Sequence, residues 1–149
     1  MAIIFIKADF MLEIEVKIIQ HNEQRYDTVG DWWFSSEKLD GRIMWETLQV
    51  RVSRMNNENY EFLVARHEID EAMLCRARGI KEALVTRFDT TFEKLRKAQP
   101  EKFQGEPGDH ADAPYRKEHF FATTQERAMA AELGVDWEEY DEAVNSLSF

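Results

Sequence analysis

The chain has 149 residues, with 29 acidic against 19 basic side chains and a formal net charge of −10. This length fits one domain with one core. The acidic balance argues against nucleic acid as a partner, because no basic stripe is available to neutralise phosphates. No window approaches the ~20 apolar residues of a membrane span, and a single cysteine fits a reducing compartment. We therefore expect a cytoplasmic protein that binds neither nucleic acid nor membrane.

The first third of the chain predicts a small, mostly antiparallel sheet. Apolar, alternating or aromatic runs that are typical of strands occupy residues 2–7, 11–20, 28–35 and 42–53. The pair Asp40-Gly41 is a hairpin turn signal before the last of these runs. Strands are thus expected over about residues 2–53. Trp32, Trp33 and Trp45 are expected in the core or the sheet, and an exposed one would indicate a partner surface.

The remainder of the chain has helical spacing. Four helices are expected, over about residues 57–79, 81–97, 113–133 and 136–147, with one long loop at 100–112. Asn56 or Asn57 can cap the first helix, and Gly79 can end it. Apolar residues lie on two sides of this helix, which is typical of a helix packed between other elements. The sequence therefore predicts a single α+β domain over 1–149, with the first helix central.

The first helix carries an ionisable pair inside its apolar stripe. His67 and Glu71 lie one turn apart, where their side chains can touch and where burial is expected. A buried ionisable pair needs partners, because an unpaired buried charge is costly. The pair therefore indicates either hydrogen bonds that hold helices in register or part of a metal site.

The third helix repeats this arrangement. His119 and Glu126 share one face with small or apolar residues, so that this helix can approach a neighbour closely. If the first and third helices pack together, His67, Glu71, His119 and Glu126 converge. Two histidines with one or two carboxylates suffice to bind zinc, iron or manganese. The competing interpretation of Glu126 is an exposed helix charge beside Arg127.

The long loop holds a further polar cluster around His110, with Asp109 and Asp112 beside it. Clusters of this composition are usually polar turns. A carboxylate in this loop could nevertheless reach a metal ion.

The segment His67-Glu68-Ile69-Asp70-Glu71 resembles the HExxH helix of zinc metallopeptidases, with Glu71 in place of the second histidine. The resemblance implies that His67 and Glu71 are metal ligands and that His119 is the third ligand. It also implies that Glu68 is the general base for a metal-bound water. Glu71 departs from the family pattern, although His₂Glu is an accepted catalytic zinc set.

Longer stretches are similar to small uncharacterised proteins of phages and prophages: LVARHEIDEAMLCRARGI, APYRKEHFFAT and LGVDWEEYDEAV. This resemblance brings no activity with it and implies the cytoplasm of a host cell as the location.

Two hypotheses of different classes follow. The first is a divalent-metal-dependent hydrolase that resembles a minimal metallopeptidase, with zinc as the expected ion and a peptide or protein as the substrate. The second is a non-enzymatic phage accessory protein that binds a host or virion protein, with a structural His/Glu cluster. A carboxylate-rich two-metal site is a third interpretation, and it would need Glu126 or Glu68 as an additional ligand.

Overall fold

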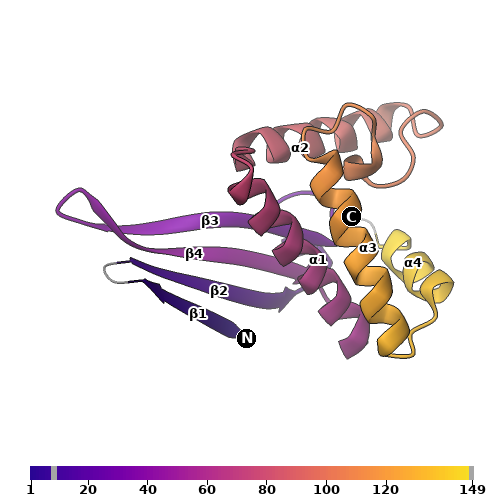
Figure 1. Ribbon diagram of the computed structural model, residues 1–149. Coiled ribbons are helices and arrows are strands. Elements are labelled where there is room, and N and C mark those ends of the chain that lie inside the picture. The colour runs from indigo at the N-terminus through magenta and orange to yellow at the C-terminus, as the bar shows by residue number, and fades with distance from the viewer. Residues whose placement is uncertain (8–9, 148–149) are drawn as a thin grey trace.

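The computed structural model describes residues 1–7 and 10–147, and it has an α+β fold in which a four-stranded sheet precedes the helices (Figure 1). The strands are β1 (Ala2–Lys7), β2 (Phe10–Ile19), β3 (Gly30–Leu39) and β4 (Arg42–Ser53). The helices are α1 (Glu58–Ala77), α2 (Glu82–Ala98), α3 (Arg116–Glu132) and α4 (Trp137–Asn145), and the two 3-10 turns are η1 (His21–Glu23) and η2 (Pro107–Asp109). The predicted fold class is confirmed.

The sheet is mixed, with the strand order β1-β2-β4-β3. Its two outer pairs are antiparallel, whereas β2 and β4 run parallel, with Ile14 opposite Leu48. The predicted hairpin turn is present, and both Asp40 and Gly41 have positive φ there. The sheet is thus mostly antiparallel, as predicted. The parallel β2–β4 pair was not predicted, because local sequence patterns do not show that β4 lies between β2 and β3.

Helix α1 is central, as predicted. It packs on β3 and β4 on one side and on α3 on the other. Leu63, Ala72 and Cys75 of α1 are fully buried in the main core, together with Leu48 of β4. The second apolar side of α1 is only partly covered, because Phe62 is 41% exposed.

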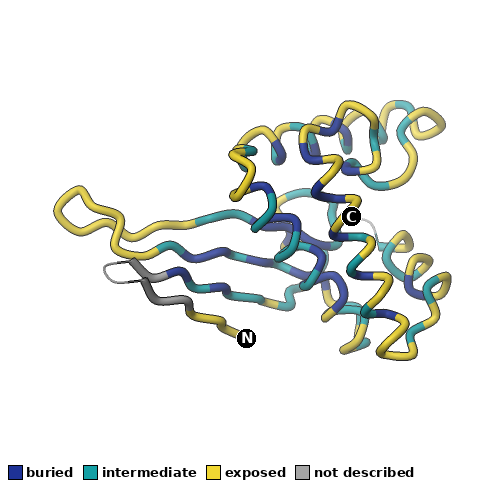
Figure 2. Tube along the Cα trace, viewed as in Figure 1, coloured by how far each residue is buried: buried dark blue, intermediate teal, exposed yellow. Residues whose placement is uncertain are grey.

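The far end of the sheet extends beyond the helices that cover it (Figure 2). There β3 and β4 continue as a two-stranded arm, defined here as residues 37–45. The large apolar side chains on this arm are exposed: Leu39, Ile43, Met44 and Trp45. Strand β3 was expected to end at residue 35, and it continues to Leu39 because the hairpin pairing persists up to the turn.

The three tryptophans of the sheet have different surroundings. Trp32 is buried in the core, as expected. Trp33 lies against the guanidinium groups of Arg25 and Arg51, whose carbons are 4.3 and 5.0 Å from a ring centroid. Trp45 is 40% exposed on the arm. All three tryptophans therefore lie in the core or the sheet, as expected, and Trp45 has the exposure that would indicate a partner surface.

Helix α3 begins at Arg116, later than the predicted residue 113. Tyr115 is its N-cap residue, so Pro114 lies before the helix. The segment between α2 and α3 is the expected long loop, and it is interrupted only by the short turn η2.

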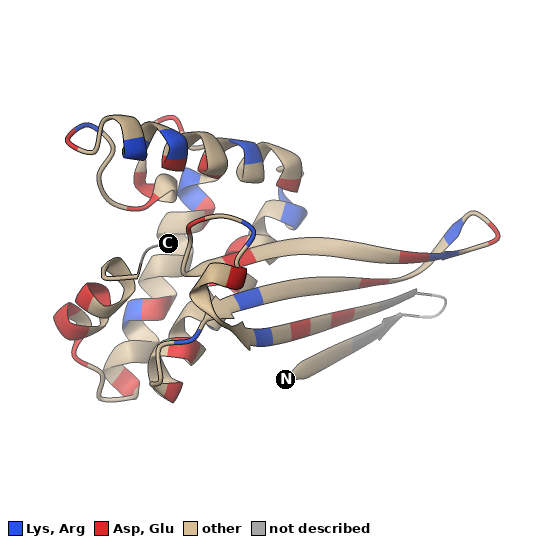
Figure 3. Ribbon diagram, turned by 180° about the vertical axis from the view of Figure 1, so that it is seen from behind, with Lys and Arg blue, Asp and Glu red and all other residues tan. Residues whose placement is uncertain are grey.

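Charge is distributed unevenly over the helices (Figure 3). Four acidic residues and no basic residue lie on α4, over residues 137–145. Basic residues of α2 are Arg87, Lys94, Arg96 and Lys97. None of the described helices is long and apolar enough to cross a membrane.

Candidate metal centre

Helix α1 presents His67 and Glu71 on the face that meets α3. The helix begins at the expected cap, where the Asn57 side chain accepts hydrogen bonds from the backbone N–H groups of Asn59 and Tyr60. The helical period then places His67 and Glu71 one turn apart, and both are buried. The predicted burial of this pair is therefore observed.

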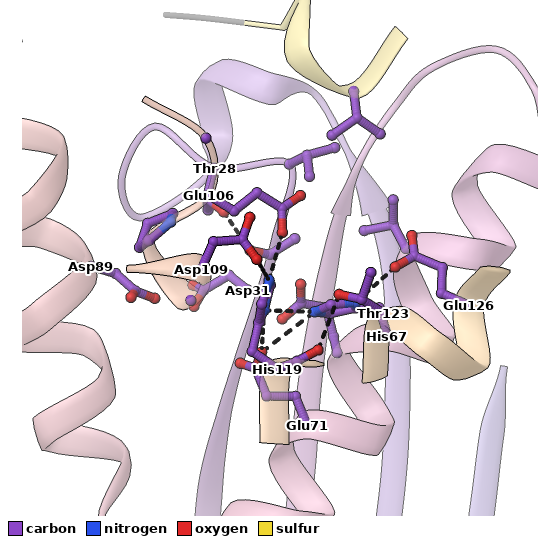
Figure 4. Close-up of a pocket in the computed structure, with 18 of the residues that line it drawn as sticks. Thr28, Asp31, His67, Glu71, Asp89, Glu106, Asp109, His119, Thr123 and Glu126 are labelled. Atoms are coloured by element: carbon purple, nitrogen blue, oxygen red, sulfur yellow. Dashed lines mark hydrogen bonds and ion pairs between the residues drawn. The ribbon is translucent and has the colours of Figure 1, made fainter. Parts of the chain in front are cut away.

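Helix α3 brings His119 and Glu126 to the same place, and both are buried as well (Figure 4). His67 Nδ1 lies 2.8 Å from Glu126 Oε2, and His67 Nε2 lies 3.1 Å from His119 Nδ1. His119 Nδ1 is also 3.0 Å from Glu71 Oε2. His67, Glu71 and His119 thus contact one another, and Glu126 joins them through His67.

Three of the atoms in this cluster form a compact triangle, called here the donor triangle. Its corners are His67 Nε2, Glu71 Oε2 and His119 Nδ1, which are separated by 3.0 to 3.4 Å. Donors bound to one tetrahedral zinc ion at ~2.0–2.2 Å stand roughly 3.3–3.6 Å apart. The third side, at 3.4 Å, falls in this range, and the sides of 3.0 and 3.1 Å are slightly shorter. The triangle therefore has the donor types of a His₂Glu site and would have to widen slightly around an ion.

Glu126 lies on the other side of the His67 ring from the triangle. Its Oε2 accepts a hydrogen bond from His67 Nδ1, and its Oε1 accepts one from the Tyr140 hydroxyl of α4. Glu71 is fixed in the same manner, because the indole N–H of Trp32 donates to its Oε1 at 2.9 Å and leaves Oε2 for the histidines. These outer contacts hold the triangle in place.

The long loop supplies two further carboxylates, at the Nε2 side of His119. Glu106 Oε2 lies 3.0 Å from Nε2 and Asp109 Oδ1 lies 3.4 Å from it. Nε2 is nevertheless a buried atom without a hydrogen bond among the described residues, although these oxygens are close. His119 Nε2 thus lies on the side of the ring away from the donor triangle, beside two carboxylates that can accept its proton.

A buried His-Glu-His group in this cluster could hold a metal ion. His67, Glu106 and His119 each offer one atom, and the three atoms lie within 4.8 Å of one another. Glu71 adds a fourth donor through the triangle. Nitrogen and carboxylate donors in this mixture suit zinc, iron or manganese.

The electrostatics of the cluster favour positive charge at its centre. Burial alone lowers the pKa of His67, but its hydrogen bonds with Glu126 and Glu71 outweigh burial and raise the pKa well above its ordinary value. Burial alone raises the pKa of Glu71, and its contacts with His119 and His67 reverse that shift and lower the pKa to about 2. The carboxylates therefore stabilise a cation between them, which is the charge a metal ion also brings.

Glu68 lines the same cavity but makes no hydrogen bond or ion pair with another described residue. Its side chain packs against Gly30, where an added Cβ would lie 2.3 Å from Glu68 Oε1. Burial, with the Glu71 carboxylate as the next cause, raises the pKa of Glu68 well above its ordinary value. The structure thus places the predicted base beside the cluster and outside its hydrogen bonds.

The cluster forms one wall of a cavity of about 930 Å³. Segments from η1 to α4 contribute to its walls, including Phe120 of α3 and Trp137 and Val144 of α4. The cavity is large enough for a short peptide segment, and small-molecule sites commonly have this size.

Sequence reasoning missed three groups that shape the centre. Trp32 and Tyr140 reach it from β3 and α4, and neither residue type signals a metal site by itself. Glu106 was also missed, although the loop was marked as able to supply a carboxylate. The sequence does contain a signal that could have indicated Glu106 as a site residue. It is the pair of acids, Glu106 and Asp109, on either side of Pro-Gly in the long loop.

A second cluster resembles a Ser-His-Asp arrangement but does not offer a nucleophile. His21 Nδ1 lies 2.8 Å from Ser53 Oγ, and His21 Nε2 lies 3.0 Å from Asp27 Oδ1. Ser53 is fully buried, and its hydroxyl donates to the Thr28 carbonyl. These contacts connect the end of β4 to the segment before β3, and we assign them a structural role.

No protein-family model matches the chain, and neither does any curated protein or any solved structure. The chemistry of the site therefore has to be inferred from its geometry alone.

Proposed function

We propose that this protein is a divalent-metal-dependent hydrolase whose ion is held by His67, Glu71 and His119. One observation carries the proposal: three donor atoms from α1 and α3 meet within 3.4 Å of one another on the wall of a large cavity. Catalytic zinc sites characteristically have three protein ligands of these types and one open position. We infer zinc from the His₂Glu set.

The surrounding residues have roles that follow from their positions. Glu126 orients His67 through Nδ1, and Trp32 orients Glu71, so that their remaining donor atoms face the triangle. Glu126 is thereby assigned to support His67 rather than to bind the ion. The bound ion supplies Lewis-acid chemistry, which polarises a carbonyl and makes water more acidic.

Glu68 is the proposed general base. Its carboxylate lines the cavity next to the ligand His67 and has no hydrogen-bonding partner among the described side chains, so it is available to a substrate or to water. In the hydrolysis of an amide, Glu68 accepts a proton from the attacking water and passes it to the leaving nitrogen. The water oxygen bonds to the carbonyl carbon, and the carbon–nitrogen bond breaks. The resemblance of His67–Glu71 to a metallopeptidase helix supports a peptide as the substrate class.

The competing function is a non-enzymatic protein in which the cluster is structural. The observation in its favour is that the His67–Glu126 and His119–Glu71 contacts already form hydrogen bonds without an ion. A structural role, with or without a bound metal, predicts a folded protein that hydrolyses no peptide. A phage origin and a host or virion partner belong to this proposal.

The deciding experiment measures metal content by elemental mass spectrometry, on protein purified without a metal-affinity tag. We expect about one zinc ion per chain in the wild type. His67→Ala and His119→Ala should lose it, because each removes a ligand. His21→Ala is the matched control: His21 also lines the cavity but lies outside the donor triangle, so metal content should persist.

Turnover of a mixture of internally quenched peptides then tests the enzymatic step. Glu68→Gln should retain the metal and lose hydrolysis, because it removes a proton acceptor and no ligand. A wild-type protein that takes up no metal on titration would contradict the metal centre. A metal-loaded protein without peptide hydrolysis would favour the structural alternative.

A further inference from the structure

The two histidines of the centre are supported by carboxylates in the same manner but to different degrees. Each presents one ring nitrogen to the donor triangle and the other to an acidic side chain: Glu126 at His67, and Glu106 with Asp109 at His119. Metal-bound histidines almost always have this outer partner, which fixes ring orientation and donor strength. The loop carboxylates are therefore the counterparts of Glu126.

The two supports differ in how firmly they are held. The Glu126 side chain is 9% exposed, hydrogen-bonds to His67 and is tied to Tyr140. The side chains of Glu106 and Asp109 are 43% and 65% exposed, and neither completes a hydrogen bond with His119 Nε2. The support of His67 is part of the core, whereas that of His119 is open to solvent.

Residues 106–110, called here the strap, are seated directly on the His119 ring. A Cβ added at Gly108 would lie 2.3 Å from His119 Cγ and 2.5 Å from its Nδ1. Only a residue without a side chain allows the strap backbone to come this close. The glycine between the two acids is thus what allows both carboxylates to reach Nε2.

Side chains of α2, together with Phe103 of the loop, anchor the strap at both ends. Before it, Arg96 of α2 donates a hydrogen bond to the Gly105 carbonyl. At its end, the His110 ring lies 5.8 to 6.3 Å, between centroids, from three aromatic rings: Phe88, Phe92 and Phe103. The middle of the strap, which carries the two acids, has no comparable attachment except its contact with His119 and one hydrogen bond from Arg116 to the Asp109 carbonyl.

We propose that Glu106 and Asp109 are positioning residues for metal binding that act through His119. Their support is present when the strap is seated on the His119 ring and is lost when the strap moves away. This inference rests on the proposed metal centre. With the strap seated, Nε2 of His119 faces a carboxylate and Nδ1 is held toward the ion. With the strap displaced, the ring loses that orientation and the ion is held less tightly. The strap then sets the metal affinity through His119. Glu106 is also close enough to His67 and His119 to be a ligand itself, and the cobalt spectrum described below distinguishes the two roles.

The test is the zinc affinity of the full chain, measured by competition with a chromophoric chelator. Glu106→Gln and Asp109→Asn should each weaken zinc binding by only a few-fold, because either carboxylate can replace the other. The double variant should weaken it by roughly 10–100-fold, as loss of an outer carboxylate does at other sites. Glu101→Gln is the control: Glu101 is an exposed acid of the same loop, and it should bind zinc like the wild type.

A second variant separates the effect of the strap backbone on the His119 ring from the effect of the two carboxylate charges. Gly108→Ala should weaken zinc binding about as much as the double variant, because the strap or the ring has to move. Combined with the double variant, Gly108→Ala should add little, since both changes remove the same contact.

The absorption spectrum of the Co²⁺-substituted protein shows whether a ligand has changed. It should keep the wild-type bands in the double variant, because a positioning residue alters affinity and not the ligand set. A lost oxygen ligand in that spectrum would overturn the positioning role and make Glu106 a ligand. Unchanged zinc affinity in the double variant would overturn the strap alone, whereas a wild type that binds no zinc would overturn the centre with it.

Discussion

At the scale of single residues, Asp89 is a buried acid outside the donor triangle. It accepts hydrogen bonds from the hydroxyls of Tyr115, at 2.5 Å, and Tyr26, at 3.0 Å. Burial raises the pKa of Asp89 from 3.8 to about 7, and the hydrogen bond from Tyr115 offsets this only in part. The folded protein therefore holds a proton on Asp89 that the unfolded chain releases.

This proton makes stability depend on pH in a definite direction. Between pH 3.8 and about 7 the folded state binds more protons at Asp89 than the unfolded state. The free energy of unfolding therefore falls as pH rises through this window, by on the order of 1.4 kcal/mol per pH unit at most. Asp89→Asn stays neutral and should lose this contribution.

Urea unfolding of the wild type and Asp89→Asn at pH 5 and pH 8 measures the effect. The stability of Asp89→Asn relative to the wild type should increase from the lower pH to the higher one. Asparagine accepts only one of the two tyrosine hydrogen bonds, but that cost is the same at both values. A pH-independent difference between the two proteins would contradict the shifted pKa.

At the scale of elements, α4 is connected to the centre through one hydroxyl group. Tyr140 is buried, its ring packs on Tyr60 and Trp137 with centroids 5.2 and 5.3 Å away, and its hydroxyl donates to Glu126. The packing fixes α4 and the hydroxyl fixes Glu126. The two contributions can be separated by removing the oxygen alone.

Tyr140→Phe should keep the packing and destabilise Glu126. A hydrogen bond to a charged group contributes about 1.5–3 kcal/mol, so the free energy of unfolding should fall by an amount of this order. Zinc affinity should also fall several-fold, because Glu126 orients His67. Urea unfolding and chelator competition measure the two effects. Tyr60→Phe is the control, since its hydroxyl makes no hydrogen bond to a described residue, and an equal loss of zinc affinity there would contradict the proposed connection.

The predictable part of the site came from α1 and α3. His67 with Glu71, and His119 with Glu126, lie on apolar faces whose helical period is visible in the sequence, so their burial and convergence could be inferred. The strap could not be inferred, because Glu106 reaches His119 through the course of a loop that has no period. The parallel pairing of β2 with β4 is likewise a contact between segments far apart in the chain, and no local pattern encodes it.

At the scale of the whole molecule, the proposed ion would connect α1 to α3. Both helices contribute ligands to it, and α1 also forms the main core with β4. A ligand that binds only the folded state raises its stability, by about 2.7 kcal/mol at a free concentration 100 times the dissociation constant.

Thermal unfolding with zinc and with a chelator tests this coupling. Zinc should raise the midpoint in the wild type, and the shift should disappear in His119→Ala. An equal midpoint with zinc and with the chelator would mean that the ion binds the folded and the unfolded chain equally well, which contradicts a site that folding assembles from α1 and α3.

The arm at residues 37–45 lies at the opposite end of the sheet from this chemistry. Among the described residues that line the cavity, the sheet contributes only the beginning of β3, up to Trp32, and none of the arm. Substitutions in the arm therefore do not alter the shape of the cavity directly. The molecule thus holds its candidate chemistry and its exposed apolar arm at separate ends of the sheet.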